Sequence, residues 1–298
     1  MIDLIELAAV RLIAATVSVL PMPLVRRIGA WFGRLAYALD ISRRRTALAN
    51  LATAFPSRPE AERRALARAM FGHFGSLLLE LLKFGTYSLE QMRAAVEIEG
   101  AEHARLAYQQ GRGVLFFSGH FGYWEISGLI MPLVISPVSV LARPLDNPRL
   151  DRMLRRIRTR TGNSVIDRQG AVRKVLRALS ANQAVALLID QHLHTPDAVR
   201  VDFFRRPAAT TSALAALALR TGAPVIPFFC LPQPDGRYRL VYEHPVDPPT
   251  ADTPDAVLEF TQRCTDVLEM YVRRHPELWL WMHRRWRADQ AAALEADA

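Results

Sequence analysis

The pattern of apolar and polar positions divides the chain into an N-terminal part with helical periodicity and a longer part in which strand and helix patterns alternate. Residues 1–95 show only helical patterns, and residues 58–82 have apolar positions at helical spacing. Beyond residue 95, short apolar runs alternate with amphipathic segments. Such alternation predicts an α/β fold with a mostly parallel sheet flanked by helices.

The expected elements can be placed on the chain. Strands are expected at residues 114–117, 138–141, 164–166, 184–189, 225–229 and 238–242, and helices at residues 122–133, 148–160, 171–180, 210–220 and 255–274. The run 184–189 is wholly apolar, which is typical of a strand buried on both faces. The expected domain division is residues 1–95 as a helical membrane-associating region, 96–287 as the α/β domain and 288–298 as a frayed tail.

The first helical segment has the character of a membrane anchor. Residues 3–20 are apolar except for Asp3, Glu6 and Arg11, which fall within one arc of roughly 140° on a helical wheel. A cleaved signal peptide would begin with cations and end at small residues, and this segment does neither. The pattern favours an amphipathic or tilted membrane-anchoring helix, although a helix packed in the core would show similar periodicity. Arginines and aromatics beyond it, at residues 26–34, suit the headgroup region of a cytoplasmic leaflet or a solvated basic face.

Net charge and cysteine content limit the classes of partner and ligand that this chain is expected to bind. The net charge is +9 and the pI about 10.2, and among the cations only Lys83 and Lys174 are lysines. This balance indicates nucleic acid, an anionic membrane face or an acidic protein as a partner. We find no helix-turn-helix, RNP-like or zinc-finger pattern, so nucleic acid is not expected. Cys230 and Cys264 lie far from any metal-ligand cluster in the sequence and are expected to be free thiols without a metal.

One short stretch has the residues expected of a catalytic site on the loop between a strand and a helix. A predicted strand runs into Ser118-Gly119-His120, and Glu125 follows five residues after the histidine. On one continuous helix that spacing would separate the two side chains by about 140°, so they can meet only if His120 lies on the loop before a helix. Glu125 would then fix the imidazole tautomer, leaving the other ring nitrogen to take a proton from a hydroxyl. Backbone N–H groups at the start of that helix would suit a developing oxyanion. The spacing alone also arises by chance; the strand–glycine–histidine–glycine–helix context makes it informative.

Several segments in order resemble a known family. SGHFGYWE resembles the His-x4-Asp/Glu motif of the lysophospholipid acyltransferase superfamily, and the full set resembles its lipid A late-acyltransferase branch, which adds secondary lauroyl or myristoyl chains. The resemblance covers about residues 10–287. The other matching blocks are RRRTALANLATAFP from Arg43, ARPLDNP around Arg143, Asp190-Gln191, FFRRPAAT from Phe203, GAPVIPF from Gly222 and HPELWLWMHRRW from His275.

The resemblance implies a glycerolipid acyltransferase-like fold, a reaction and a set of roles. A fatty acyl chain would pass from a thioester of acyl carrier protein or coenzyme A to a hydroxyl of a lipid A precursor or a related membrane lipid, without a cofactor or metal. His120 would be the base, Glu125 its partner, and Arg143 the holder of a phosphate or acyl-carrier group. Asp190 ends a buried strand at the same sheet edge, and with Gln191 it would contact substrate or shape the pocket. A surface arginine and a turn-capping aspartate are the simpler alternatives for Arg143 and Asp190.

The implied location is the inner (cytoplasmic) membrane, with a peripheral or single N-terminal anchor and the active site facing the cytoplasm. Six arginines at residues 149–160 would dock an acidic carrier protein, contact anionic lipid, or be solvated. After Gln191 the family has a glycine-rich turn where this chain has His192 to Pro196, which leaves the acceptor and the chain length open. Other acceptors are a lysophospholipid, an ornithine lipid or a phosphoinositide glycolipid. The rivals from other classes are a non-catalytic peripheral lipid-binding protein and a membrane glycosyltransferase.

Overall fold

A seven-stranded sheet forms the centre of the molecule, in the order β1-β9-β8-β2-β5-β3-β4. The computed structural model describes residues 2–167, 170–193, 195, 198–250 and 254–286. Within this sheet, neighbouring strands pair in parallel except β8 with β9. The predicted α/β class with a mostly parallel sheet is therefore confirmed. The strands are β1 (Val96–Glu99), β2 (Val114–Ser118), β3 (Val138–Ala142), β4 (Ser164–Asp167), β5 (Ala184–Leu188), β8 (Val225–Pro232) and β9 (Tyr238–Tyr242).

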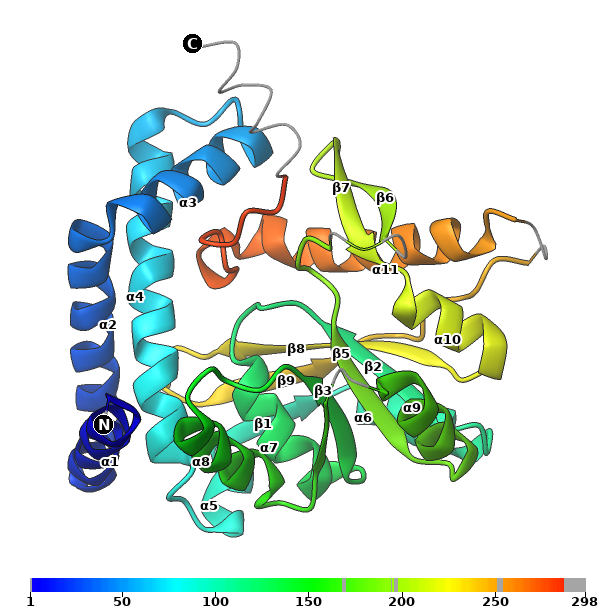
Figure 1. Cartoon of the computed structure of the whole chain (residues 1–298), viewed down its shortest axis with the longest axis horizontal. Coiled ribbons are helices and arrows are strands. Elements are labelled where there is room, and N and C mark those ends of the chain that lie inside the picture. Colours follow the sequence, from blue (N-terminus) through cyan, green and yellow to red (C-terminus); the bar gives the residue numbers. More distant parts are fainter. Residues whose placement is uncertain (1, 168–169, 194, 196–197, 251–253, 287–298) are drawn as a thin grey trace.

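Helices cover the sheet on both faces, with α11 crossing one face and α7 lying on the other (Figure 1). The buried strands β2, β5 and β8 are almost wholly apolar because both of their faces are covered. The helices of this part are α6 (Ala101–Gln109), α7 (Trp124–Val134), α8 (Pro148–Thr159), α9 (Ala171–Ser180), α10 (Ala213–Thr221) and α11 (Ala256–Arg274).

A β-hairpin replaces part of one predicted helix. Residues 210–220 were expected to be helical throughout, but β7 (Arg206–Thr211) pairs antiparallel with β6 (Ala198–Phe203), and α10 begins only at Ala213. Thr210 and Thr211 are β-branched, and their pairing with β6 suits such residues better than a helix does. The strand β1 and the helix α6 had no counterpart among the predicted elements.

The N-terminal part is a set of helices in which α2 and α4 pack with unusually close backbones. A Cβ atom built on Gly33 would lie 1.9 Å from the Phe71 carbonyl oxygen, and one on Gly75 would lie 2.2 Å from the Gly29 carbonyl oxygen. Only glycine permits this approach, so the spacing of these glycines fixes how the two helices cross. The helices are α1 (Ile2–Val19), α2 (Met22–Leu39), α3 (Ile41–Ala54), α4 (Glu60–Phe84) and α5 (Leu89–Ala94).

Helix α1 makes polar contacts with the rest of the protein near both of its ends and exposes much of its apolar surface. Its Glu6 carboxylate accepts a hydrogen bond from Asn147 at 2.7 Å, and its C-terminal carbonyl groups accept bonds from the buried Lys83. Leu12 and Val19 are 71% and 80% exposed. This arrangement differs from a helix packed in the core and suits the predicted membrane contact. Among the described helices, α4 alone is long and apolar enough to cross a membrane, and half of its most apolar window is buried within the protein.

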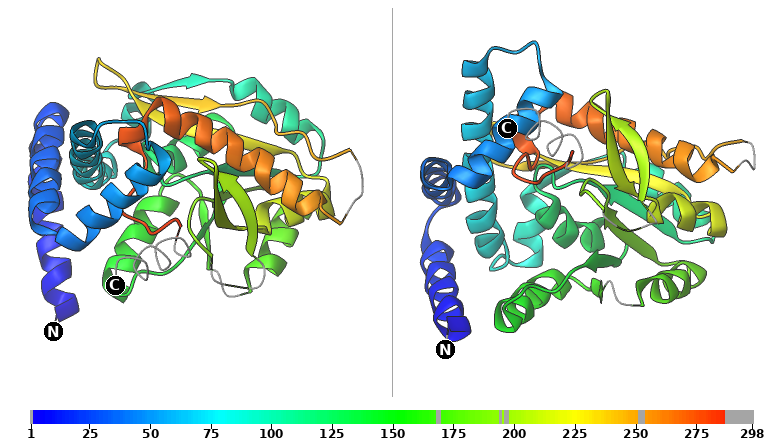
Figure 2. Two further views of the ribbon diagram at one scale, coloured as in Figure 1. Left: turned by 90° about the horizontal axis from the view of Figure 1, so that it is seen from above. Right: turned by 45° about the horizontal axis from the view of Figure 1, so that its top comes forward.

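The segment after α11 returns to the N-terminal helices and closes the core. The Asn50 side chain in α3 donates to the carbonyl oxygens of Trp281 and His283, both at 2.7 Å. Trp279 and Trp281 are almost fully buried between the two parts of the chain. Two parts that are far apart in sequence therefore share one core (Figure 2).

Candidate active site

The site lies at the carboxyl ends of β2 and β5, which are neighbours in the sheet. In the register of this parallel pair Ser118 is opposite Leu188. Continuing both chains by two residues brings His120 opposite Asp190. The two residues are 70 positions apart in the chain, and the pairing of β2 with β5 brings them together. A corner outside the carboxyl ends of parallel strands is a usual place for ligands in α/β proteins.

Asp190 holds His120 through two hydrogen bonds. Its Oδ1 atom accepts from the imidazole Nδ1 at 2.8 Å, and its Oδ2 atom accepts from the His120 backbone N–H at 2.7 Å. The indole Nε1–H of Trp279 also donates to Oδ2, at 2.8 Å. The Asp190 side chain is 3% exposed and that of His120 is 21% exposed. The carboxylate is thus enclosed, whereas the imidazole still reaches the surface of the site.

The sequence-based assignment of Glu125 as the hydrogen-bonding partner of His120 is wrong. Glu125 lies in the first turn of α7, as expected, but both of its oxygens accept hydrogen bonds from Arg158 of α8, one of them at 2.9 Å. The two side chains are largely buried, with 15% and 17% exposed. Because a planar guanidinium matches a carboxylate with two parallel bonds, Arg158 competes successfully for Glu125. Asp190 was expected to contact substrate or cap a turn, and in the structure it is instead the partner of the imidazole.

The charges around His120 favour its protonated form more than burial disfavours it. Burial alone would lower the pKa of His120, but the Asp190 carboxylate, with a smaller effect from Glu125, raises that pKa above its ordinary value. Burial alone would also raise the pKa of Asp190, and its bonds with His120 and Trp279 instead lower it to about 2. Asp190 is therefore ionised at neutral pH and accepts the Nδ1 proton. In the neutral imidazole, the opposite ring nitrogen, Nε2, is then the acceptor.

Gln191 lies beside that free nitrogen. Its Nε2 atom is 3.3 Å from His120 Nε2. A side-chain amide nitrogen can only donate, so the ring nitrogen accepts, which agrees with a proton on Nδ1. Gln191 is exposed, so it occupies the position where an approaching substrate group would meet the imidazole.

The loop carrying His120 is fixed by bonds from distant parts of the chain. The Gly122 N–H donates to the Leu278 carbonyl oxygen at 2.9 Å, and the Leu280 N–H donates to the His120 carbonyl oxygen at 3.1 Å. His73 of α4 is 3.1 Å from the Gly122 carbonyl oxygen through its Nε2 atom. Gly122 has a φ of +57°, and a Cβ there would lie 2.1 Å from the Cys230 carbonyl oxygen. A side chain cannot be accommodated at this corner.

The backbone N–H groups of this loop are engaged within the protein. Those of residues 120, 121, 122 and 123 donate to Asp190, to Gly119, to Leu278 and to Cys230 respectively. The expected backbone oxyanion donors therefore do not come from these four residues. These bonds do not involve the backbone N–H groups in the first turn of α7, from Trp124 onwards, so the predicted oxyanion donors would have to come from that turn.

A buried carboxylate supports the loop from behind. Glu80 of α4 is fully buried and accepts hydrogen bonds from the hydroxyls of Tyr123 and Tyr238 and from Arg26, with the Tyr123 bond at 3.0 Å and the Arg26 bond at 2.9 Å. Its partners come from α2, from the residue before α7 and from β9. The N-terminal helices and the His120 loop thus share one polar network inside the protein.

The remaining predicted residues fall in different environments. Arg143 follows β3 at the same sheet edge, is 74% exposed and lies 3.3 Å from Asp146, so the structure leaves its predicted role open. The predicted loop from His192 to Pro196 lies partly outside the described residues. Within the described chain, no group of three or more His, Cys, Asp or Glu side chains is placed to hold a metal ion. Cys230 and Cys264 are buried and free, as expected.

Arg158 was missed by the sequence analysis as an individual site residue. It was seen only as one of six arginines on an amphipathic helix, and nothing in the local pattern separates it from its neighbours. The partnership of Asp190 and His120 had a weak signal, because both follow apolar strands. Pairing them requires knowing that β2 and β5 are adjacent.

Comparison with known proteins identifies the family of this chain. A family model described as bacterial lipid A biosynthesis acyltransferase matches residues 4–288. The chain is 29% identical to the lipid A biosynthesis lauroyltransferase of Escherichia coli (strain K12), over 90% of this chain and 87% of that protein. It is 27% identical to the myristoyltransferase of the same strain, over 92% and 83%. It is also 25% identical to the phosphatidylinositol mannoside acyltransferase of Mycolicibacterium smegmatis, over 75% and 73%. The chain therefore belongs to the bacterial lipid A biosynthesis acyltransferase family and is an enzyme that transfers acyl groups.

Proposed function

We propose that this enzyme moves a fatty acyl chain from an acyl carrier protein thioester to a hydroxyl group of a lipid A precursor, using His120 as the general base. The observation that carries the proposal is the imidazole bonded through Nδ1 to a buried, ionised carboxylate, with its Nε2 atom 3.3 Å from the Nε2 atom of the exposed Gln191. A base in this tautomer is suited to take a proton from a hydroxyl.

The reaction uses the chain's own side chains in a simple sequence. His120 Nε2 removes the hydroxyl proton as the oxygen attacks the thioester carbonyl carbon, and Asp190 stabilises the imidazolium that forms. The tetrahedral intermediate collapses, the carbon–sulfur bond breaks, and the proton passes from Nε2 to the leaving thiolate. The products are an ester and a free thiol. This sequence needs neither a metal nor a cofactor beyond the acyl thioester.

The Glu125–Arg158 pair is proposed to border the reacting groups rather than to orient the base. Its carboxylate raises the pKa of His120, whereas the guanidinium opposes that effect. Arg143 at the end of β3 and Gln191 beside Nε2 are the proposed substrate contacts. Arginine suits a phosphate group, which a lipid A precursor would supply.

The names of the relatives favour a glycolipid acceptor. Most of the similar proteins are lipid A acyltransferases, and one is a phosphatidylinositol mannoside acyltransferase. A phosphoinositide glycolipid is therefore the second candidate acceptor. Both acceptors combine sugar hydroxyls with phosphate, which is consistent with the proposed roles of His120 and Arg143.

The enzyme is proposed to work at the cytoplasmic face of the inner membrane. Supporting this, α1 and α2 expose apolar side chains over a continuous N-terminal region that also carries exposed arginines. Apolar groups next to cations favour the interface of an anionic bilayer. The exposed apolar residues are Ile2, Leu4, Ile5, Leu12, Ile13, Val19, Leu24, Trp31, Phe32, Leu35 and Leu39.

The proposal is tested by incubating purified protein with acyl carrier protein thioester and either a lipid A precursor or a phosphoinositide glycolipid. The product is identified by mass spectrometry. Wild-type protein should give an acylated lipid, and His120→Gln should lower the rate by roughly 10²–10⁴-fold because the base is lost. Thermal unfolding of both proteins serves as the folding control. Equal rates for wild type and His120→Gln, or no acylated product from any of these lipids, would refute the proposed function.

A further inference from the structure

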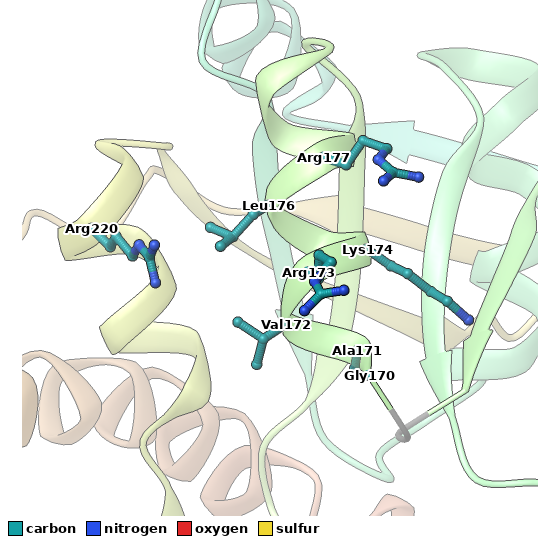
Figure 3. Close-up of a pocket in the computed structure, with 8 residues that line it drawn as sticks. All are labelled: Gly170, Ala171, Val172, Arg173, Lys174, Leu176, Arg177 and Arg220. Carbon is teal, nitrogen blue, oxygen red and sulfur yellow. The ribbon is translucent and has the colours of Figure 1, made fainter.

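A basic hollow lies between α9 and α10, away from the residues of the proposed active site. It has a volume of about 880 Å³, and neither His120 nor Asp190 lines it. Figure 3 shows Arg220 projecting from α10 towards α9, opposite Val172 and Leu176. We call this surface the α9–α10 groove; its lining residues are Gly170, Ala171, Val172, Arg173, Lys174, Leu176, Arg177 and Arg220.

The cations of the α9–α10 groove lack acidic partners. Arg173, Lys174, Arg177 and Arg220 are all exposed, and among the described ion pairs none involves these side chains. Neither α9 nor α10 contains an aspartate or glutamate. Four neighbouring like charges that form no ion pair with any described acidic residue create a positive field that attracts an acidic partner.

The basic face of α8, for which the sequence left carrier docking, lipid contact and solvation open, is different. Arg155 pairs with Asp151 and Asp167, and Arg158 pairs with Glu125. Two of the five arginines of α8 are therefore paired within the protein. Its exposed arginines, Arg149, Arg152 and Arg156, provide a matched comparison for the groove.

The α9–α10 groove also offers apolar contact. Val172 is 58% exposed, and Leu176, one turn further along α9, is partly exposed beside it. An amphipathic acidic helix presents both features that this surface would contact, a row of carboxylates and an apolar strip. A fully hydrated phosphate would use only the cations.

The position of the groove favours a protein partner over the membrane. Helices α9 and α10 lie at the opposite end of the molecule from α1 and α2, which carry the exposed apolar surface (Figures 1 and 2). A bilayer held by the outer surface of α1 and α2 would leave the α9–α10 groove open to a soluble protein. Because a carrier protein presents its thioester on a long flexible arm, it can dock away from His120.

We propose that the α9–α10 groove is the docking surface for an acidic helix of the acyl carrier protein that delivers the acyl chain. The inference rests on the proposed function in one respect, namely that the donor is a carrier-protein thioester. It adds the surface that the carrier recognises and assigns Arg173, Lys174, Arg177 and Arg220 to that recognition.

The test measures carrier binding separately from catalysis. Fluorescently labelled acyl carrier protein is titrated with wild type, with Arg173→Glu/Lys174→Glu/Arg177→Glu, and with the control Arg149→Glu/Arg152→Glu/Arg156→Glu on α8. We expect the groove variant to bind the carrier at least ~10-fold more weakly than the control does. Added salt should weaken wild-type binding more than that of the groove variant, because exposed charges are screened.

Two further measurements identify the partner class. The groove variant should show a raised KM for the carrier thioester but an unchanged KM for the same acyl chain on uncharged pantetheine. Its binding to phosphatidylglycerol vesicles should match that of wild type. Loss of vesicle binding with normal carrier binding would overturn the proposal in favour of a lipid contact, and equal carrier binding by all three proteins would overturn it outright. If the carrier binds as predicted but wild type yields no acylated lipid, the proposed function fails while the docking surface stands.

Discussion

Replacing Asp190 by asparagine should reverse the tautomer of His120 with almost no change in shape. Oδ2 accepts two N–H donors, from the His120 backbone and Trp279, whereas Oδ1 accepts only the imidazole Nδ1–H. In Asp190→Asn, the side-chain amide oxygen would take the place of Oδ2 and accept the same two N–H donors. Its NH₂ group would then face Nδ1, so the imidazole proton would move to Nε2 and block that atom as a base.

The size of the effect follows from the role of the base. A positioned general base contributes roughly 10²–10⁴-fold in rate, so Asp190→Asn should lower kcat by about that factor, which corresponds to about 2.7–5.4 kcal/mol in activation free energy. Since the Asp190 carboxylate raises the pKa of His120, the acid limb of the residual activity should also move to lower pH. KM for the acyl donor should change little, because Asp190 is enclosed by the protein.

The assay is kcat and kcat/KM across about pH 5–9 for wild type, Asp190→Asn and Trp279→Phe. Trp279→Phe removes one donor to Asp190 but leaves the imidazole proton on Nδ1, so its kcat should stay within about tenfold of wild type. An Asp190→Asn enzyme with nearly full kcat and an unmoved acid limb would refute the tautomer argument.

Three other perturbations test separate features of the site. Glu125→Gln and Arg158→Met should each impair kcat by leaving a partly buried charge unpaired, and their double-mutant cycle should show a coupling energy of about 0.5–3 kcal/mol; additive effects would argue against the pair. Gly122→Ala should lower both Tm and activity because its Cβ would lie 2.1 Å from a carbonyl oxygen, and wild-type values for both would contradict that geometry. Burial lowers the pKa of His73 to about 4. Between about pH 6.5 and pH 4 the unfolded chain therefore binds a proton at His73 and the folded chain does not. The free energy of unfolding should fall by at most about 3 kcal/mol as the pH drops through this range. In His73→Gln this decline, followed by denaturant titration at each pH, should be shallower; an identical pH slope would exclude His73 as its source.

The fold class and the position of His120 at the corner after β2 were predictable from the sequence, because both leave local patterns. Apolar runs without interruption mark β2 and β5, and a histidine between two glycines marks the corner after β2. The partner of the base could not be chosen locally. Glu125 is near in sequence, but the register of β2 with β5 gives that place to Asp190, and Arg158 arrives from a different helix to bind Glu125.

The α2–α4 contact was also beyond the sequence analysis. Its glycines at positions 29, 33, 72 and 75 become informative only when two helices are known to face each other. The buried Glu80 likewise appeared as an ordinary polar residue within a helical pattern. Its significance depends on two tyrosines and an arginine from three other segments.

The C-terminal segment has a consequence for biosynthesis. Leu278 and Leu280 bond directly to the His120 loop, and Trp279 bonds to Asp190. A nascent chain whose C-terminal segment is still inside the ribosome exit tunnel would already include both members of the His–Asp pair but would lack the bonds that this segment makes to the His120 loop and to Asp190. The candidate site would therefore be completed only after Leu280 has left the tunnel, late in the production of the chain.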